Sequence, residues 1–303
     1  MGDQVPAAVE ATTIGELPCW LLRSPHGEAL VARQGAQLLR YTPSGQPPVV
    51  WLSDAAEFRA GQPLRGGMPV CWPWFGQFDR NPAEVRAMLA AGAEAPAHGF
   101  ARTHDWQLVE AQAAGVQASL QLRLELPTGW AGWPHPASVM LEVRLDEALT
   151  VTLSTSNLGA DPIVVSQALH TYFAVSDVRK VVIDGLEGTS YIDTLRDWSA
   201  HRQPGTLAIQ GETDRIYTGI DTPVSIRDPG WRRTIHVQAF DSRSAVVWNP
   251  WVEKSLRLSQ FRPDAWRDML CIETARVWDD LLHLPPGASA TTGVTLRAAP
   301  EGA

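Results

Sequence analysis

The sequence predicts an all-β protein, a large antiparallel β-sandwich with a few short helices. Apolar and polar residues alternate with a period of two over many short segments, which is typical of strands with one buried and one wetted face. The chain contains 23 prolines and 24 glycines, so it turns often. No rhythm of alternating strands and helices occurs, and no glycine-rich loop joins a strand to a helix. These absences argue against a nucleotide-binding α/β fold.

The strand predictions rest on individual segments. Ser119–Leu126 places four leucines on one face and polar residues on the other. Val139–Leu145 and Leu149–Thr155 follow the same alternation. Further strands are predicted at Trp106–Ala111, Thr234–Phe240 and Thr291–Arg297. Between the first two segments, the Gly/Pro-rich stretch Pro127–Pro136 is predicted to form a long hairpin loop that carries Trp130 and Trp133.

One helix is predicted, over Asn81–Gly92. Asn81 is a capping residue, Pro82 suits the first helical position and Gly92 suits the end. Glu84 stands three residues after Asn81, as in a capping box. The helix would dock on a sheet edge or mouth through one apolar face, which comprises Val85, Met88 and Leu89.

Length alone permits one large domain or two ordinary ones, but no interdomain linker stands out, so we expect a single domain over residues 1–303, with residues 1–18 loosely ordered. The N-terminus lacks the pattern of a signal peptide, and no stretch approaches the roughly 20 apolar residues that span a bilayer. We therefore expect a cytoplasmic protein without membrane contact, a monomer or weak homo-oligomer. The net charge of −8 argues against nucleic acid as a partner. Cys19, Cys71 and Cys271 match no zinc pattern, and burial of the last two is expected.

Two aromatic segments suit contact with a ligand. Arg65–Gly76 combines close-approaching glycines with three aromatic rings, on which sugars could stack. Val246–Lys254 sets polar groups and two indoles, including Trp248, beside a proline turn. Each segment has an ordinary alternative, because the first could be an aromatic core turn and the second a strand corner.

Three further segments contain candidate ionisable groups. In His98–Arg102, the arginine provides a planar fork that suits a phosphate or carboxylate. His170 lies in an apolar strand, where a structural role is the more common one, although histidine titrates in the range that acid–base catalysis needs. Glu273 closes a hydrophobic strand, which is costly unless the carboxylate is paired, hydrated or functional. Desolvation would raise its pKa and make it a better base. A salt bridge to an arginine is the alternative.

Together these segments resemble the hexose-6-phosphate mutarotases, the glucose-6-phosphate 1-epimerase family of the aldose-1-epimerase superfamily. The resemblance is carried by six motifs in the family's order: RGGMPVCWPWFG, HGFAR, ALHTYF, DRIY, VVWNPWVEKS and MLCIETA, from Arg65 to Ala275. It implies a galactose-mutarotase-like supersandwich with its site on a concave sheet face. It also implies exchange of the α and β anomers of a hexose 6-phosphate, with glucose 6-phosphate foremost.

The resemblance also implies roles for individual residues. His170 would be the general acid and Glu273 the general base. Arg65 and Arg102 would contact the phosphate. The sugar would be held by His98, Asp214 and Trp248. Neither a metal nor an organic cofactor is expected, because ring opening involves no redox step and no difficult carbanion.

Two features depart from the family pattern. The segment from Phe78 to Pro96 is longer than usual and contains the predicted helix, which could shape or cover the site. Ala97 stands where many relatives carry glutamine. Two other functions therefore stay open: an epimerase of unphosphorylated aldoses, and a carbohydrate-binding or sensing protein without turnover.

Overall fold

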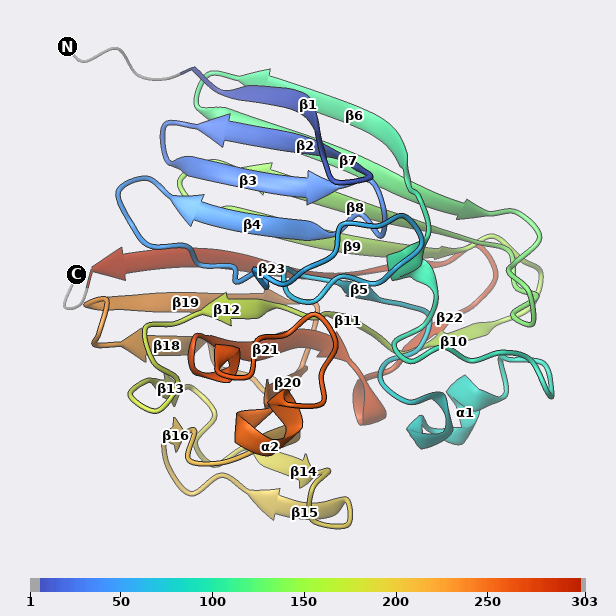
Figure 1. Ribbon diagram of the computed structural model, residues 1–303. Helices are drawn as coiled ribbons and strands as arrows, with labels where there is room; N and C mark the ends of the chain where they lie inside the picture. Colours follow the sequence, from blue (N-terminus) through green and yellow to red (C-terminus); the bar gives the residue numbers. More distant parts are fainter. Residues whose placement is uncertain (1–5, 301–303) are drawn as a thin grey trace.

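The computed structural model describes residues 6–300, and its strands form two large facing sheets (Figure 1). One sheet has nine antiparallel strands, and the core lies between its inner face and the other sheets. In spatial order its strands are β16 (Leu207–Ala208), β13 (Val182–Asp184), β18 (Val224–Asp228), β19 (Arg233–Phe240), β23 (Ser289–Pro300), β9 (Leu149–Asn157), β8 (Ala137–Leu145), β7 (Gln117–Leu126) and β6 (Gln107–Ala114). The predicted strands all fall within this sheet, apart from Trp106, which directly precedes β6.

The second large sheet has eight strands and carries the residues of interest. It comprises β15 (Ser199–Arg202), β14 (Ser190–Asp193), β17 (Thr213–Thr218), β20 (Ser244–Asn249), β21 (Met269–Arg276), β11 (Gln167–Leu169) and β5 (Val70–Cys71), with β12 (Tyr172–Ala174) also paired to β21. Because β11 and β12 both pair with β21, the chain between them is held against one continuous strand. This interruption leaves a short irregular segment at His170 and Thr171, both of which are buried.

Two smaller sheets complete the sandwich. The N-terminal sheet contains β1 (Ala8–Ile14), β2 (Leu17–Ser24), β3 (Gly27–Ala32) and β4 (Leu38–Pro43), and it contacts β6, β7 and β8 of the nine-stranded sheet. A short pair is formed by β10 (Ile163–Val165) and β22 (Leu282–Leu284). The N-terminal sheet therefore covers one half of the nine-stranded sheet, and the eight-stranded sheet covers the other (Figure 1).

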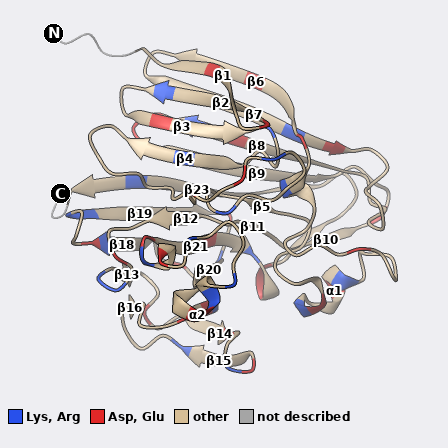
Figure 2. Ribbon diagram, in the orientation of Figure 1, with Lys and Arg blue, Asp and Glu red and all other residues tan. Residues whose placement is uncertain are grey.

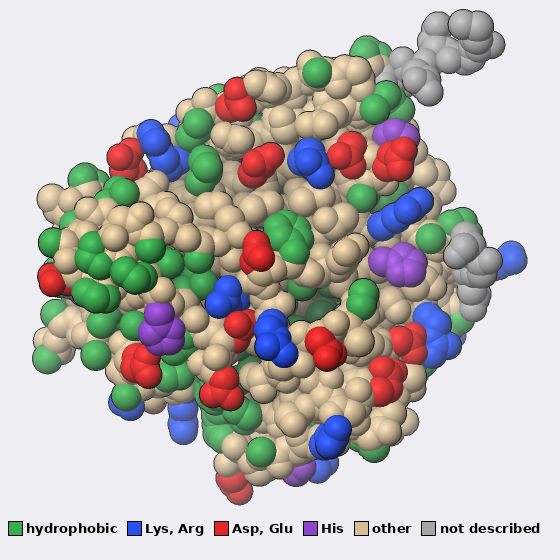
Figure 3. Space-filling view, turned by 180° about the vertical axis from the view of Figure 1, so that it is seen from behind, with side chains coloured by type: hydrophobic (Ala, Val, Ile, Leu, Met, Phe, Trp, Pro, Cys, Tyr) green, Lys and Arg blue, Asp and Glu red, His purple; other side chains and the backbone are tan. Residues whose placement is uncertain are grey.

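Strict alternation decides which face of β7, β8 and β9 is buried. In β7 the four leucines are buried at 7% exposure or less, while the intervening side chains are partly or fully exposed. Each such leucine contributes about 1.5–3 kcal/mol through burial. On the outer face, hydroxyl pairs such as Thr150 with Thr295 (3.0 Å) bridge neighbouring strands. Seen from behind, this face is mostly polar, with charges of both signs (Figure 3).

The predicted helix is much shorter than expected. Only Ala83–Arg86 (α1) is α-helical, after a 3₁₀ turn at Phe78–Arg80. Asn81 does not cap it, because its Nδ2 donates backwards to the carbonyls of Phe75 (2.8 Å) and Gln77 (3.0 Å). The helix stops because the chain turns to bind the 127–136 loop: Ala90 N–H donates to the Gly132 carbonyl at 2.7 Å. The apolar face is confirmed, since Val85 is buried and Met88 and Leu89 pack on the core.

The other helical segments are equally short. They are α2 (Trp251–Ser255) and the 3₁₀ turns Ala101–Thr103, Ala265–Arg267 and Trp278–Asp280. No helix within residues 6–300 is both long and apolar enough to cross a membrane. Acidic and basic residues are interspersed along the ribbon (Figure 2).

The expectation that residues 1–18 are loosely ordered is wrong for the part of this segment that the structure describes. Ala8–Ile14 is not loose but pairs with β2 in unbroken register, from Ala8 opposite Arg23 to Ile14 opposite Leu17. Residues 1–5 of the expected loose segment lie outside the described residues. Cys71 and Cys271 are buried free thiols, as predicted, and so is Cys19.

Candidate active site

A cavity of about 700 Å³ opens on the outer face of the eight-stranded sheet. The sheet supplies its floor, and loops before α1, after α2 and around Arg65 supply its walls. All seven residues singled out from the sequence line it: Arg65, His98, Arg102, His170, Asp214, Trp248 and Glu273. Segments separated by more than a hundred residues in sequence therefore meet in one pocket.

Strand register explains why the floor residues share a face. In the ladder, Asp214 lies opposite Trp248 and Val246 lies opposite Glu273. Since side chains alternate between faces and directly paired residues share one, these four point to the same side. Glu273 lies inside β21 rather than at its end, between Ile272 and Thr274, and its side chain is 2% exposed.

His170 reaches Glu273 from the break between β11 and β12. Its backbone N–H donates to the Pro69 carbonyl at 3.0 Å, which holds the irregular segment in place. Its Nε2 lies 3.4 Å from Glu273 Oε1, and its side chain is 10% exposed. Among the ion pairs of residues 6–300, Glu273 is matched with this histidine rather than with an arginine.

Burial shifts the pKa of both members of this pair. Desolvation, and secondarily the charge of Asp214, raises the pKa of Glu273 well above its usual range. Desolvation, followed by the positive charges of Arg102 and Arg65, lowers the pKa of His170 to about 3. Both shifts favour a neutral carboxyl beside a neutral imidazole over an imidazolium–carboxylate pair, because neither charged form is solvated at this site.

Two buried atoms of the pair have no partner in the protein: His170 Nδ1 and Glu273 Oε2. An unsatisfied buried polar atom costs about 1–3 kcal/mol. Such atoms in a cavity can be satisfied by a ligand. The pair therefore retains hydrogen-bonding capacity towards whatever fills the pocket.

With Nδ1 free of hydrogen bonds, aromatic contacts orient the His170 ring. Tyr172 stacks on it in parallel, with centroids 4.8 Å apart and an interplanar angle of 8°. Trp51 stacks in turn on Tyr172 at 5.9 Å. His98 approaches the edge of His170 at 5.3 Å. The Tyr172 hydroxyl also accepts a hydrogen bond from Arg65 Nη1 at 3.4 Å, which ties this stack to the arginine.

His98 is held as a neutral donor. Its Nδ1 lies 3.2 Å from Cys71 Sγ and accepts the Gly76 N–H at 3.3 Å. An accepting Nδ1 carries no proton, so the neutral ring carries its proton on Nε2. Desolvation and the nearby charges lower the His98 pKa well below its usual range, which keeps the ring neutral. The chain takes φ +65° at His98, and Gly99 follows so tightly that a Cβ there would meet the Trp72 carbonyl at 2.0 Å.

Arg65 and Arg102 supply positive charge to the same cavity. Arg102 donates through Nη2 to the Ala97 carbonyl at 2.7 Å, and burial lowers its pKa. Arg65 is positioned by Gly66, where φ is +104° and a Cβ would lie 2.8 Å from Leu52 Cα. Both guanidinium groups retain further N–H donors, because each hydrogen-bonds through only part of its fork.

Asp214 and Trp248 lie beside Lys254. Burial raises the Asp214 pKa to about 6, and Lys254 partly offsets this. The Lys254 ammonium lies 5.9 Å from the Trp248 ring and 3.0 Å from Glu212. The neighbouring Asn249 forms the strand corner, since its Nδ2 donates to the Trp266 and Met269 carbonyls. The segment Val246–Lys254 therefore contains both a residue that faces the cavity, Trp248, and an adjacent residue that forms a strand corner, Asn249.

Several cavity residues were missed by the sequence argument. Tyr172 and Lys254 stand inside two of the six family motifs. Tyr172 could have been identified, because it lies two residues after His170 and side chains alternate between the faces of a strand. Arg80, Trp198 and Trp278 line the cavity from loops, and isolated loop aromatics carry no sequence signal of shared location. Across residues 6–300, no group of three or more His, Cys, Asp or Glu residues could hold a metal ion.

Comparison with known proteins identifies the family. The family model for aldose 1-epimerase matches residues 18–297. The chain belongs to the aldose 1-epimerase family. Among relatives, a candidate glucose-6-phosphate 1-epimerase of Escherichia coli K12 is 32% identical over 276 residues, covering 90% of this chain and 88% of that protein. A candidate glucose-6-phosphate 1-epimerase of the grass Cenchrus ciliaris is 28% identical, covering 88% and 80%.

Solved structures agree with this membership. A candidate mutarotase from Salmonella typhimurium superposes with a TM-score of 0.85 at 27% identity, covering 97% of this chain and 94% of that one. Galactose 1-epimerase from Lactobacillus acidophilus shares the fold, with a TM-score of 0.72 at 14% identity and 97% and 99% coverage. The predicted mutarotase-like β-sandwich is thereby confirmed.

Proposed function

We propose that this aldose 1-epimerase family member interconverts the α and β anomers of a hexose 6-phosphate, foremost glucose 6-phosphate. The observation that carries the proposal is a buried pair, His170 and Glu273, whose Nε2 and Oε1 atoms lie 3.4 Å apart in the same cavity as two arginine side chains. The names of the relatives in Escherichia coli and Cenchrus ciliaris support the phosphorylated substrate. The arginines support it physically, since guanidinium groups bind phosphate through paired N–H donors.

Anomer exchange requires one group that removes the proton of the C1 hydroxyl and one that protonates the ring oxygen. The ring then opens to the aldehyde, rotates about C1–C2 and closes on the other face. Glu273 would take the first proton and His170 would deliver the second, with the roles reversed on closure. Each positioned group typically contributes about 10²- to 10⁴-fold to the rate.

The resting protonation of the pair suits this cycle. A proton held by Glu273 need only move across the 3.4 Å to His170 Nε2 to create the working acid and base. Arg102 and Arg65 disfavour that transfer, because their charges lower the His170 pKa. A phosphate dianion bound to the arginines would neutralise those charges. A phosphorylated substrate would thus favour the active proton arrangement without any proton taken from solvent.

The remaining cavity residues would hold the sugar. His98 would donate through Nε2–H to a hydroxyl oxygen, and the Asp214 carboxylate would accept from hydroxyl groups once it ionises above about pH 6. Trp248 would present an indole to the C–H face of the ring. The single-domain organisation, the cytoplasmic location and the monomeric or weakly oligomeric state stay predictions.

Exchange spectroscopy by NMR on glucose 6-phosphate tests the proposal. The protein should speed exchange between the two anomeric signals, and His170→Ala should remove most of the gain. Running glucose in parallel separates an epimerase of unphosphorylated aldoses, which would turn over both sugars alike. Saturable binding without faster exchange would contradict catalysis and favour a sugar-binding or sensing protein.

A further inference from the structure

A buried thiol contacts one of the cavity histidines. Cys71 Sγ lies 3.2 Å from His98 Nδ1, and the cysteine is fully buried. The two residues meet because β5 ends at Cys71 and the next residue, Trp72, bridges to Gly99. The Phe100 N–H also donates to the Trp72 carbonyl at 3.1 Å. These backbone contacts lay the segment that carries His98 beside the end of β5.

Strand register points the thiol towards the cavity. Cys71 lies opposite Ala168 in β11, and Ala168 lies opposite Ala275 in β21. Directly paired residues share a face, and Ala275 stands two residues after Glu273. Cys71 therefore shares the face of Glu273, on which the cavity opens. On this face the thiol packs in an apolar cluster, whose other buried members are Ala168, Ile216, Val246, Ala275 and Val277.

A second contact at the same nitrogen decides the direction of the hydrogen bond. The Gly76 N–H donates to His98 Nδ1 at 3.3 Å, and the His98 N–H donates to the Gly76 carbonyl at 2.8 Å. A proton on Nδ1 would face the Gly76 N–H, and the two donors would repel each other. Cys71 therefore donates its S–H to Nδ1 and does not accept from it. Burial raises the pKa of the thiol well above its usual range, so the thiol keeps the proton that it donates.

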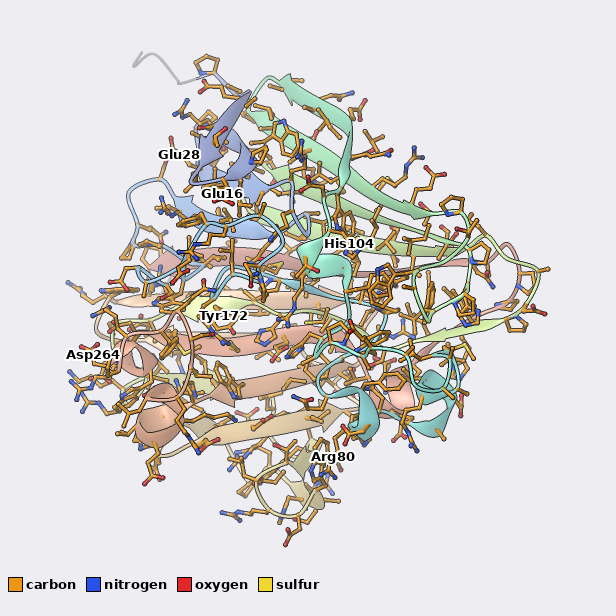
Figure 4. The ribbon with its side chains drawn as sticks, turned by 45° about the vertical axis from the view of Figure 1, so that its right-hand side comes forward. Glu16, Glu28, Arg80, His104, Tyr172 and Asp264 are labelled. Carbon is orange, nitrogen blue, oxygen red and sulfur yellow. The ribbon has the colours of Figure 1, made fainter. Side chains whose placement is uncertain are left out.

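The contacts at Nδ1 determine what the other ring nitrogen of His98 does. A neutral imidazole that accepts at Nδ1 donates from Nε2. Phe75 and His170 contact the same ring, with centroids 5.1 and 5.3 Å away and interplanar angles of 80° and 61°. Tyr172, which stacks on His170, marks this part of the central sheet in Figure 4. The ring of His98 is thus held from several sides while the residue lines the cavity.

We propose that Cys71 is a positioning residue for the reaction: its thiol donates to His98 Nδ1 and so directs the His98 Nε2–H into the cavity. This rests on the proposed function, in which that N–H donates to a hydroxyl oxygen of the substrate. Cys71 acts only through the imidazole ring, because it is fully buried. Free cysteine behaves as a small hydrophobe with a weak donor, so it suits the apolar cluster and still bonds to the ring.

Infrared spectroscopy of the S–H stretch tests the direction of this bond without any assay of activity. The difference spectrum between the wild type and Cys71→Ala isolates the Cys71 thiol, and Cys19→Ala isolates a reference thiol in the same way. Cys19 Sγ lies 3.4 Å from the Leu17 carbonyl, in a separate cluster. The Cys71 band should lie at lower frequency, because an imidazole nitrogen is a stronger acceptor than a carbonyl oxygen. A Cys71 band at the same or a higher frequency would overturn the proposal.

Exchange kinetics with glucose 6-phosphate test the consequence for the reaction. Cys71→Ala should raise the KM about two- to tenfold, which corresponds to one hydrogen bond, and should leave kcat within about twofold of the wild type. Cys71→Ser should keep the KM close to that of the wild type, because its hydroxyl can still donate to His98 Nδ1. The serine variant thereby separates donation from packing, since both variants remove the sulfur atom.

Cys19→Ala is the matched control, because it removes a likewise buried thiol from the N-terminal sheet. It should leave both kinetic constants unchanged. Equal increases of KM in Cys71→Ala and Cys71→Ser would contradict the proposal, and so would an unchanged KM in Cys71→Ala. Absence of any exchange by the wild type would contradict the proposed function instead, and the infrared bands would still decide the direction of the hydrogen bond between Cys71 and His98.

Discussion

Replacing Glu273 by glutamine would remove an ionisable carboxyl and keep the size and shape of the side chain. Burial raises the pKa of this carboxyl well above its usual range, which favours the protonated form. A glutamine amide therefore imitates the resting form and can still donate towards His170 Nε2, which lies 3.4 Å from Oε1 in the wild type. The substitution should leave the fold intact and abolish proton transfer.

The activity loss follows from the role of the group. A positioned base contributes about 10²- to 10⁴-fold, which corresponds to roughly 3–5 kcal/mol of activation free energy. We expect the enzymatic exchange rate of glucose 6-phosphate to fall by that factor. A pKa above the unfolded value means that the folded state holds its proton to higher pH. Wild-type stability therefore declines as pH rises from about 4.5 towards the folded-state pKa.

The glutamine variant has no ionisable proton at this position, so its stability should not decline over this pH range. Its melting temperature should match that of the wild type near pH 4 and exceed it at neutral and alkaline pH. Exchange spectroscopy and thermal unfolding across pH 4–9 would measure both effects. Retained exchange activity would refute the assignment of Glu273 as the base. A variant less stable than the wild type at pH 8 would refute the buried, protonated carboxyl.

Three further predictions address the neighbours of this pair. Arg65→Ala should raise the KM for glucose 6-phosphate without lowering turnover of glucose, because it removes a hydrogen-bond donor to the phosphate; equal loss on both sugars would contradict this. Tyr172→Leu should lower kcat about tenfold or more, because it removes the ring that stacks on His170, whereas Tyr172→Phe should keep kcat. If steady-state kinetics showed equal losses of kcat in both variants, the stacked ring would not be what orients His170. Asn249→Ala should lower the free energy of unfolding by about 2–4 kcal/mol, because it strands two buried carbonyls; urea unfolding with no change would show that the corner is held otherwise.

Much of the sandwich could be predicted from local patterns. β7, β8 and β9 alternate so regularly that sequence alone shows which side chains are buried. For the helix after Asn81, the same kind of local reasoning gave a wrong prediction. Its capping residues are locally correct, but Asn81 binds preceding carbonyls and Ala90 binds the 127–136 loop. A four-residue helix gains too little from its own hydrogen bonds to resist such contacts.

The site residues likewise divide into those that local sequence patterns predicted and those that they did not. Motif resemblance placed His170, Glu273, Arg65 and Arg102 together, because each stands in a recognisable segment. The cavity wall formed by Trp198 and Trp278 could not be predicted, since these residues come from turns whose separation in the sequence does not indicate that they lie close together. The strand register places the end of β14 and the end of β21 towards opposite ends of the sheet, so only the folding of the two segments that follow brings Trp198 and Trp278 into contact.

The sequence by itself determined the fold class, the buried faces of the long strands and the residues that line the cavity floor. These depend on side-chain alternation and on motifs, which are local properties of the chain. The tertiary structure alone decided how strongly the His170–Glu273 pair is desolvated and how far the cavity extends. Desolvation and charge depend on every surrounding segment, and a cavity's extent depends on loops that meet only after folding.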